Sequence, residues 1–237
     1  MPNTHFQFKQ FRIDQGQCAM KVTTEGCLLG ALVTVKGDEE RVLDIGAGTG
    51  LLSLMIAQRS EVKVDAVEVD EAAARQAAEN FSKSPWKDRL FCHLGRVQAF
   101  AQSTVERYDL VVSNPPFFKG HLKSGQAKDR AIHNDELSFG ELAQAVSKLL
   151  TRQGRFWVLY PAFEFGEFTS TAEEFGLELQ RVFEIYDRPG KAIFRKVGVF
   201  VKSAVGQVEE EVIFIKKEDG EYCEQFRELL KGYYLHL

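Results

Sequence analysis

The sequence has 237 residues, of which 44% are hydrophobic, and a formal net charge of −4. This apolar content suffices for one hydrophobic core, so we expect a single domain spanning residues 1–237. The negative balance argues against a protein that covers its whole surface with positive charge to bind nucleic acid, but it allows a local basic face.

Targeting and metal-binding patterns are missing from the sequence. No stretch reaches the roughly 18 apolar residues of a membrane span, and the N-terminus lacks the apolar region of a secretory signal. The cysteines at 18, 27, 92 and 223 form no C-x-x-C, and the histidines add no recognisable ligand spacing. We therefore expect reduced thiols, no metal, a cytoplasmic protein, and no membrane or obligate protein partner.

The first forty residues form an extension whose apolar positions nearly alternate. Aromatic or aliphatic side chains at 6, 8, 11 and 13 predict a strand or hairpin with a break, packed on the main domain. Lys9 and Arg12 stand beside these aromatic residues, and the alternative is that they contact nucleic acid. A short helix is predicted over 25–33, and the residues just before it, Lys21 and Thr23, cap that helix or line a ligand pocket.

A buried strand at 41–45 runs into a glycine-rich turn and then an apolar helix. Glycines at 46, 48 and 50 are typical of a nucleotide-binding strand–turn–helix unit, but the third glycine comes one residue too early for a dinucleotide fingerprint. Asp44, at the strand end, would repel a pyrophosphate. It is suited instead to holding the turn or to meeting a cationic ligand.

A second strand, at 62–67, ends at Glu68. This residue follows the glycine turn by roughly the 20 residues at which an acidic side chain binds ribose hydroxyls in doubly wound folds. Asp70 is predicted to be the N-cap of a helix over 71–81.

The pattern D-x-G-x-G-x-G resembles the first motif of the class I S-adenosylmethionine (SAM) methyltransferases. The resemblance implies that SAM is the cofactor, held by Asp44, Gly46, Gly48, Gly50 and Glu68. In that family the residues after the third strand, here 90–94, contact the adenine of SAM. Arg96 and Val97 occupy this position and would contribute backbone contacts.

Asn114, Pro115, Pro116 and Phe117 follow a fourth apolar strand, at 108–113. The prolines end the strand abruptly. The amide oxygen of Asn114 and the carbonyl of Pro115 can then accept hydrogen bonds from one NH2 group, while Phe117 stacks on the ring that carries it. The alternative is a plain Pro-Pro turn followed by a core phenylalanine.

The order of the predicted elements indicates the fold class. A helix over 136–150, a strand over 155–160, a helix over 163–175 and strands over 177–186 and 193–202 complete an α/β fold. We expect a doubly wound, seven-stranded Rossmann-like methyltransferase sheet, with the short N-terminal extension and an extra C-terminal strand at 212–215. In the order 3-2-1-4-5 the first and fourth strands are neighbours, so the glycine turn and Asn114 should face one crevice.

Two basic segments are candidates for RNA contact. The loop 118–131 contains Lys119, Lys123, Lys128 and Arg130. A second basic cluster, around the turn between the last two sheet strands, contains Arg188, Lys191, Arg195 and Lys196, of which Arg188 and Lys191 are the candidates for RNA contact. The alternative for both is a solvated charged surface. His133 borders the first loop, but methyl transfer from SAM does not require it as a base.

The Asn-Pro-Pro-Phe sequence resembles the signature of amino methyltransferases, which act on adenine N6, guanine N2 or protein glutamines. The glutamine enzymes usually carry a longer helical N-terminal domain, and the DNA adenine enzymes a large recognition insert. Residues 8–26, the Arg-Pro-Gly-Lys turn at 188–191 and the C-terminal Tyr-Leu-His-Leu resemble the bacterial enzymes that methylate N6 of adenosine 37, beside the anticodon of a valine tRNA. This similarity covers nearly the whole chain and implies that Lys21 and Thr23 approach the methionine end of SAM.

The expected activity is therefore a SAM-dependent tRNA adenine-N6 methyltransferase. Three alternatives are kept: a glutamine methyltransferase acting on a release factor, another RNA or DNA amino methyltransferase, and a non-catalytic module that binds SAM or RNA.

Overall fold

The structure, a computed structural model, describes residues 4–116, 137–203 and 206–237. Its described strands form a two-stranded hairpin and one eight-stranded sheet with the order β10-β8-β9-β7-β6-β3-β4-β5. The strands are β1 His5–Gln7, β2 Arg12–Asp14, β3 Arg41–Ile45, β4 Lys63–Glu68, β5 Leu90–Leu94, β6 Tyr108–Ser113, β7 Leu150–Tyr160, β8 Glu178–Tyr186, β9 Ile193–Val201 and β10 Glu209–Phe214. The helices are α1 Thr24–Leu32, α2 Leu51–Ala57, α3 Glu71–Ser82, α4 Val97–Ser103, α5 Phe139–Leu149, α6 Ala162–Glu174 and α7 Glu224–Leu230, with a short 3-10 turn at Lys87–Arg89.

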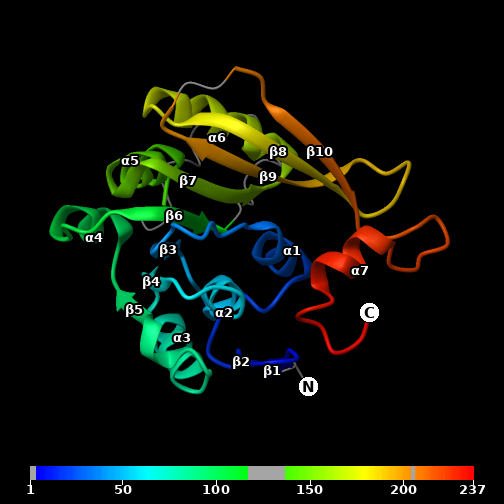
Figure 1. Cartoon of the computed structure of the whole chain (residues 1–237), viewed down its shortest axis with the longest axis horizontal. Helices are drawn as coiled ribbons and strands as arrows, with labels where there is room; N and C mark the ends of the chain where they lie inside the picture. The colour runs from blue at the N-terminus through cyan, green and yellow to red at the C-terminus, as the bar shows by residue number, and fades with distance from the viewer. Residues whose placement is uncertain (1–3, 117–136, 204–205) are drawn as a thin grey trace, which may run out of the picture.

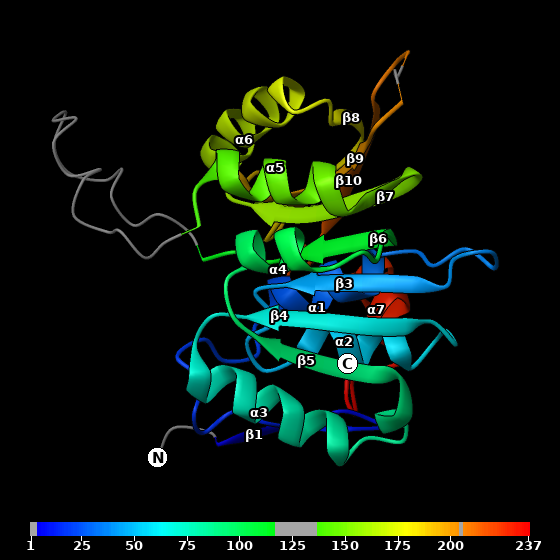
Figure 2. The ribbon, with the colours of Figure 1, turned by 90° about the vertical axis from the view of Figure 1, so that its left-hand side faces the viewer.

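Strands β3 to β7 form the parallel part of the sheet, and they confirm the predicted order. β3 pairs in parallel with β4 on one side and β6 on the other, β5 lies beyond β4, and β7 lies beyond β6. β9 is antiparallel to both β7 and β8, and β10 adds the expected extra strand at the edge. The carboxyl ends of the parallel strands all point to the same side of the molecule (Figure 2).

Helices cover both faces of the sheet because its strands carry apolar side chains on both. On one face α1, α2 and α7 pack, and Ala77 and Phe81 of α3 join the same cluster. On the other face α4, α5 and α6 enclose a second cluster around Phe156, Phe168 and Phe200. Figure 1 shows the two layers on either side of the sheet.

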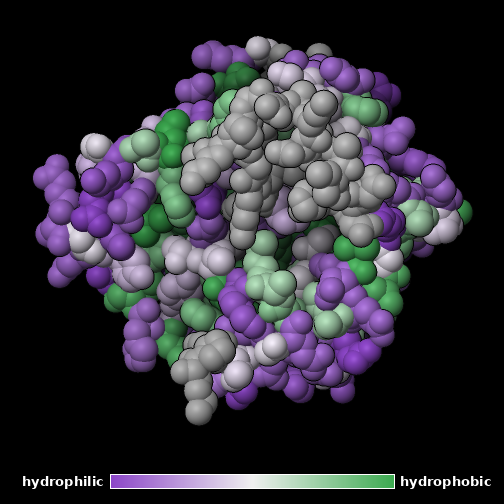
Figure 3. All heavy atoms as spheres, turned by 180° about the vertical axis from the view of Figure 1, so that it is seen from behind, coloured by the Kyte–Doolittle hydropathy of each residue, from purple (hydrophilic) through white to green (hydrophobic). Residues whose placement is uncertain are grey.

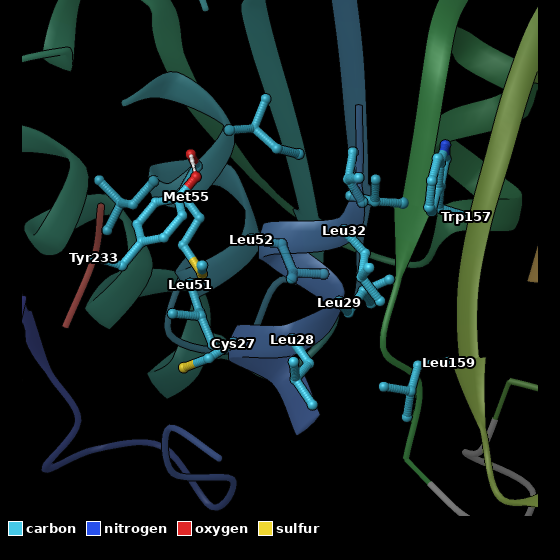
Figure 4. Close-up of a cluster of buried hydrophobic side chains, with 14 of the residues drawn as sticks. Cys27, Leu28, Leu29, Leu32, Leu51, Leu52, Met55, Trp157, Leu159 and Tyr233 are labelled. Atoms are coloured by element: carbon cyan, nitrogen blue, oxygen red, sulfur yellow. Dashed lines mark hydrogen bonds between the residues drawn. The ribbon is translucent and has the colours of Figure 1, made fainter. Parts of the chain in front are cut away.

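Helix α1 lies at the centre of the first cluster. Its leucines 28, 29 and 32 are buried, and they face Trp157 and Leu159 of β7 on one side and α2 on the other (Figure 4). After its first turn the helix carries apolar or small residues around its whole circumference, because neighbouring elements pack against all of its sides and not against one face only. Its position matters for function, since its first turn lies at the carboxyl end of β6, as described below.

The N-terminal extension packs on the domain as the hairpin interpretation predicts. Phe8 pairs with Tyr234 across an isolated bridge, and Lys9 N donates to Tyr233 O at 2.8 Å. The aromatic residues beside Lys9 and Arg12 are core residues, since Phe8 is fully buried and Phe11 is 5% exposed, so they do not support the alternative of nucleic-acid contact. Sequence alone does not reveal this, because the C-terminal residues that cover them lie more than 200 positions away.

The sequence did not predict α4 and α7. Each has only seven residues and few buried positions, Val97 and Ala101 in α4 and Phe226 and Leu230 in α7, so neither shows a helical period long enough to read. No helix in the described part of the chain is long and apolar enough to cross a membrane.

A buried ion pair fixes the loop between α1 and β3. The guanidinium of Arg155, at the middle of β7, donates to Glu39 Oε1 at 2.7 Å and to the hydroxyl and carbonyl oxygens of Thr34 at 2.8 and 2.7 Å. The side chains of Arg155 and Glu39 are only 9% and 7% exposed. The pair therefore sets where α1 ends relative to the sheet.

We expect Glu39→Ala to lower the free energy of unfolding by about 3–5 kcal/mol, because it leaves the buried Arg155 charge without a negatively charged partner. Urea unfolding followed by circular dichroism measures this change. Glu228→Ala is the matched control: it removes a carboxylate that is paired with Lys231 at the surface, where both side chains are more than half exposed, and should have a far smaller effect. Equal losses in the two variants would contradict this account of the loop.

Candidate functional site

The carboxyl ends of β3, β4 and β6 bring the predicted motifs to one edge of the sheet. Ile45 is opposite Val67 of β4 and opposite Ser113 of β6. The Ser113 hydroxyl donates to the carbonyl oxygen of Ile45 at 2.8 Å, which locks the ends of the two strands together. The glycine turn and Asn114 therefore start from adjacent positions, as the predicted strand order requires.

The glycine turn has the conformation that its sequence predicts. Gly46, Gly48 and Gly50 have φ angles of 72°, 54° and 81°, a region that other residues rarely adopt. A Cβ added to Gly46 or Gly48 would meet no atom within 4 Å, so the backbone there faces open space. A Cβ on Gly50 would lie 2.4 Å from the Phe81 ring, so this glycine allows α2 and α3 to pack closely.

Asp44 holds the helix that follows the glycine turn, and one of its two carboxylate oxygens accepts no hydrogen bond from the described residues. The side chain is fully buried, and its Oδ2 accepts hydrogen bonds from the backbone N–H of Ser53 at 3.1 Å and from its hydroxyl at 2.7 Å. Oδ1 has no hydrogen-bond partner among the described residues. Burial raises the pKa of this carboxyl to about 6, although the bonds from Ser53 oppose the shift.

Glu68 ends β4 directly beside the glycine turn. Its Oε2 accepts from the backbone N–H of Gly48 at 2.8 Å, and its Oε1 accepts from that of Asp70 at 2.9 Å. The Asp70 side chain accepts from Ala73 N, so the prediction that Asp70 caps α3 is confirmed. Glu68 is 8% exposed and both of its carboxylate oxygens accept these backbone bonds, so the side chain is held against the turn, and each oxygen keeps a lone pair for a further donor.

The next strand end holds the predicted adenine-contacting residues. Gly95 N donates to Glu68 O at 2.8 Å, so the turn after β5 lies beside Glu68. Arg96 is the N-cap of α4 and is exposed, whereas Val97 is 4% exposed and belongs to the core. Contact between their backbone and a ligand stays a prediction.

Asn114 is adjacent to the first turn of α1. A Cβ on Gly26 would lie 3.6 Å from Asn114 Nδ2 and 3.4 Å from the hydroxyl oxygen of Thr23. Thr23 accepts from Gly26 N at 3.1 Å, which confirms that it caps the helix. Asn114 Oδ1 is buried and has no hydrogen-bond partner in the part of the chain that the structure describes. An acceptor without a donor is costly unless a ligand provides one.

The extension lies against the same edge of the sheet. The Lys21 ammonium donates to the carbonyl oxygens of Gln15 and Cys18 within its own segment. Burial raises the pKa of the Cys18 thiol to about 11, and the negative charge of Glu68 adds to this shift, so the segment lies near Glu68. Lys21 is therefore close to the site, and its ammonium is engaged by backbone oxygens.

Two residues of this edge were missed by the sequence reasoning. Asn80, 2% exposed, donates to the carbonyl oxygens of Asp14 and Thr49 and accepts from Asp14 N, each at 2.9 Å, so it ties the extension to the glycine turn. Val69 is 54% exposed immediately after Glu68. The available signals were an amide among the mostly apolar buried residues of α3 and an apolar residue at a strand end.

The predicted RNA-binding residues are more scattered. Lys9 donates to Lys231 O at 2.6 Å, and Arg12 pairs with Asp14 at 2.8 Å, both in the extension. Arg188, paired with Asp187, and the exposed Lys191 lie in the turn between β8 and β9. Phe117 and the basic residues Lys119, Lys123, Lys128 and Arg130 lie outside the described residues, as does His133.

A hollow of about 610 Å³ lies at the opposite end of the sheet, where β3 and β4 begin. Its lining carries charges of both signs, from Arg41, Lys63 and Glu40 among others, and no aromatic ring. Ligands of open α/β sheets bind at the carboxyl ends of the strands, so we do not assign a site to this hollow. Among the described residues no group of three or more histidines, cysteines or acids could hold a metal ion.

Figure 3 views the face on which the parallel strands end. Polar and apolar residues alternate over the part that is coloured, so this face is neither a uniform charged surface nor a continuous apolar one.

Comparison with known proteins agrees with this geometry. Residues 23–164 match the family model of the methyltransferase small domain. The chain is 42% identical to the tRNA1(Val) (adenine(37)-N6)-methyltransferase of Cytophaga hutchinsonii and 39% identical to that of Bacteroides thetaiotaomicron, in both cases over the full length of both chains. A crystal structure of a predicted O-methyltransferase from Agrobacterium tumefaciens is similar with a TM-score of 0.70, over 87% of this chain and 95% of that one.

The structural similarity comes with 17% sequence identity and shows the fold alone, whereas the sequence similarity is high and extends over the whole chain. The chain therefore belongs to the tRNA1(Val) (adenine(37)-N6)-methyltransferase family of SAM-dependent methyltransferases.

Proposed function

We propose that this protein transfers a methyl group from SAM to the exocyclic N6 amine of adenosine 37, beside the anticodon of a valine tRNA. Full-length relatives that carry this name support the substrate. The observation that carries the proposal is the buried amide oxygen of Asn114, which has no donor among the described residues and lies at the strand end next to the glycine turn.

The residues at the turn fit SAM. The open space over Gly46 and Gly48 admits a ligand close to the backbone, Glu68 can accept from ribose hydroxyls, and the spare oxygen of Asp44 supplies negative charge for a cationic ligand. The exposed side chain of Val69 offers an apolar surface for a flat ring. SAM would supply a methyl group already activated by its attachment to a sulfonium.

The N-terminal extension, residues 1–40, helps to cover the cofactor in this proposal. Its contact with the turn through Asn80 and the closeness of Cys18 to Glu68 support the assignment. Lys21 and Thr23 would lie toward the methionine end of SAM, Thr23 by its closeness to Asn114. The extension and the sheet act together as one domain.

Asn114 and Pro115 position the amine. Their two oxygens accept its two N–H groups, which directs the nitrogen lone pair away from the ring and toward the methyl group. The prolines make the tip stiff, and the Ser113–Ile45 bond fixes its origin, so the geometry is set before the substrate arrives. Phe117 would hold the adenine ring. The proton leaves after transfer, so no strong general base is needed.

The RNA must present its base outside the stack to reach this tip. A base in a single-stranded loop is the cheapest to extract, and an anticodon loop is such a segment. Lys119, Lys123, Lys128 and Arg130 remain candidates for phosphate contact, as do Arg188, Lys191, Lys9 and Arg12.

We expect Asn114→Ala to lower the rate of methyl transfer to tRNA by roughly 100-fold or more, because one of the two acceptors that orient the amine is lost. Transfer of labelled methyl groups from SAM to valine tRNA, with nucleoside mass spectrometry of the product, measures this loss. SAM affinity, measured by calorimetry, should stay within a few-fold of wild type.

Gln102→Ala, an exposed amide on α4, is the control and should retain full activity. Methylation of a release factor in preference to tRNA by the wild-type protein, or unchanged tRNA methylation by Asn114→Ala, would refute the proposed function.

SAM binding should also depend on the ionisation of Asp44. Since burial raises its pKa to about 6, the carboxyl is charged at pH 7.5 and becomes protonated below pH 6, where it no longer attracts a cation. The dissociation constant for SAM should therefore rise as the pH falls below 6, by up to about tenfold for each further unit. Calorimetric titrations between pH 5 and 7.5 test this.

Asp44→Asn keeps an oxygen to accept from Ser53, so the turn should survive. This variant should bind SAM more weakly at pH 7.5 and show a flatter pH dependence. Identical pH profiles for the variant and wild type would mean that Asp44 only supports the backbone.

A further inference from the structure

Two phenylalanine rings are exposed at the carboxyl edge of the sheet, beyond Asn114. Phe194, at the start of β9, is 37% exposed, and Phe163, in the first turn of α6, is 61% exposed. Tyr160, the last residue of β7, pairs with Lys196. Phe194 therefore lies just past the end of β7. Phe163 follows β7 in the sequence, at the start of α6. The proposed methyltransferase reaction, as derived above, uses neither ring.

Phe194 is near the site because only β7 separates β9 from β6. Neighbouring strands are about 4.8 Å apart, so Gly198 of β9, which is level with Ser113 through Val158 of β7, lies roughly 10 Å from the end of β6. Phe194 lies four residues further along β9, so it is roughly 16 Å from the end of β6, on the side toward which the chain continues to Asn114. Nucleotides that neighbour a bound adenosine in the same single-stranded loop can reach this distance.

The position of Phe194 is fixed by a chain of contacts that leads back to Asn114. The guanidinium of Arg195 lies 4.3 Å from the centre of the Phe194 ring, and its Nη2 donates to Glu25 Oε1 at 2.8 Å. Glu25 belongs to the first turn of α1, as does Gly26, whose backbone lies against Asn114. The ring is thus held in a defined relation to the amine-binding residues.

The charges around this edge are largely balanced. Arg195 pairs with Glu25 and Lys196 with Glu184, each with less than a quarter of either side chain exposed, and Arg188 pairs with Asp187. Lys191 is exposed in the same turn. Among the described residues this edge combines few uncompensated cations with exposed aromatic rings, which fits unpaired bases better than the phosphate backbone of a duplex.

We propose that Phe194, together with the guanidinium that covers it, and Phe163 stack on bases flanking the methylated adenosine. This inference rests on the proposed function and names the part of the RNA that the second surface recognises. Aromatic rings and arginine planes both stack on bases that a single strand presents. The anticodon loop would then be bound at two points, by its extruded adenosine at Asn114 and by its neighbours at this edge.

Removing the Phe194 ring should weaken RNA binding and leave the cofactor untouched. A base stacked on an aromatic side chain contributes an amount that corresponds to a roughly 5- to 150-fold change in affinity on alanine substitution. We therefore expect Phe194→Ala to raise the KM for a valine tRNA transcript within that range, with the KM for SAM unchanged. Phe163→Ala should act in the same direction.

Three comparisons separate stacking from other roles of the ring. Phe194→Trp should retain a KM near wild type, because its ring also stacks. Phe194→Leu should raise the KM, because leucine preserves apolar bulk but does not stack on a base. This variant also tests the proposal if the alanine variant is unstable. The dependence of log KM on log salt should keep its slope in Phe194→Ala, since no phosphate contact is lost.

Phe91→Ala provides the matched control, because Phe91 is 46% exposed on β5, at the other edge of the sheet. A wild-type KM in Phe194→Ala, a fall in kcat alone, or failure of tryptophan to rescue would overturn the inference. Failure of the proposed function is distinguishable, because then wild-type protein would not methylate the tRNA at all.

Discussion

The parallel pairing of β3 with β6 is the constraint on which the proposed site depends. It brings together two turns that lie far apart in the sequence, the glycine turn after Ile45 and the tip that begins at Asn114. The hydrogen bond from Ser113 to Ile45 fixes their relative position inside the sheet, where side chains cannot adjust freely. That adjacency places the proposed site for a methyl donor next to the proposed site for an amine. It is consistent with a mechanism that depends on positioning the two groups and not on acid–base chemistry.

Much of the sheet could be predicted from the sequence, because buried parallel strands are short apolar runs that end in turn residues. Strands β3, β5 and β6 agree with their predicted residues, and β4 is shifted by one residue. The N-terminal hairpin and its packing on the domain were also expected, and the burial of Phe8 agrees with this. What the local pattern did not provide was the short helices α4 and α7, since seven residues give too few turns for a period to stand out.

The adjacency of the candidate site residues was predictable where a motif follows a recognisable strand, as with Asp44, the glycines and Asn114. It was not predictable where the contact joins distant parts of the chain. Asn80 has no motif, and its role depends on Asp14 and Thr49, which approach it only after α3 packs. Arg195 was read as part of a basic cluster, whereas the structure neutralises it with Glu25. A count of charges along the sequence therefore overestimated the positive potential of this edge.

The Glu25–Arg195 pair joins residues that are 170 positions apart, and this separation has a consequence for biosynthesis. At about 5–20 residues per second, a ribosome completes Arg195 roughly 10 to 30 s after Glu25. Until Arg195 is made, the first turn of α1 lacks this ion pair, although the glycine turn and β6 are synthesised before Arg195. The nascent chain should thus acquire its cofactor-binding half early and its catalytic competence late, once β9 has inserted between β7 and β8.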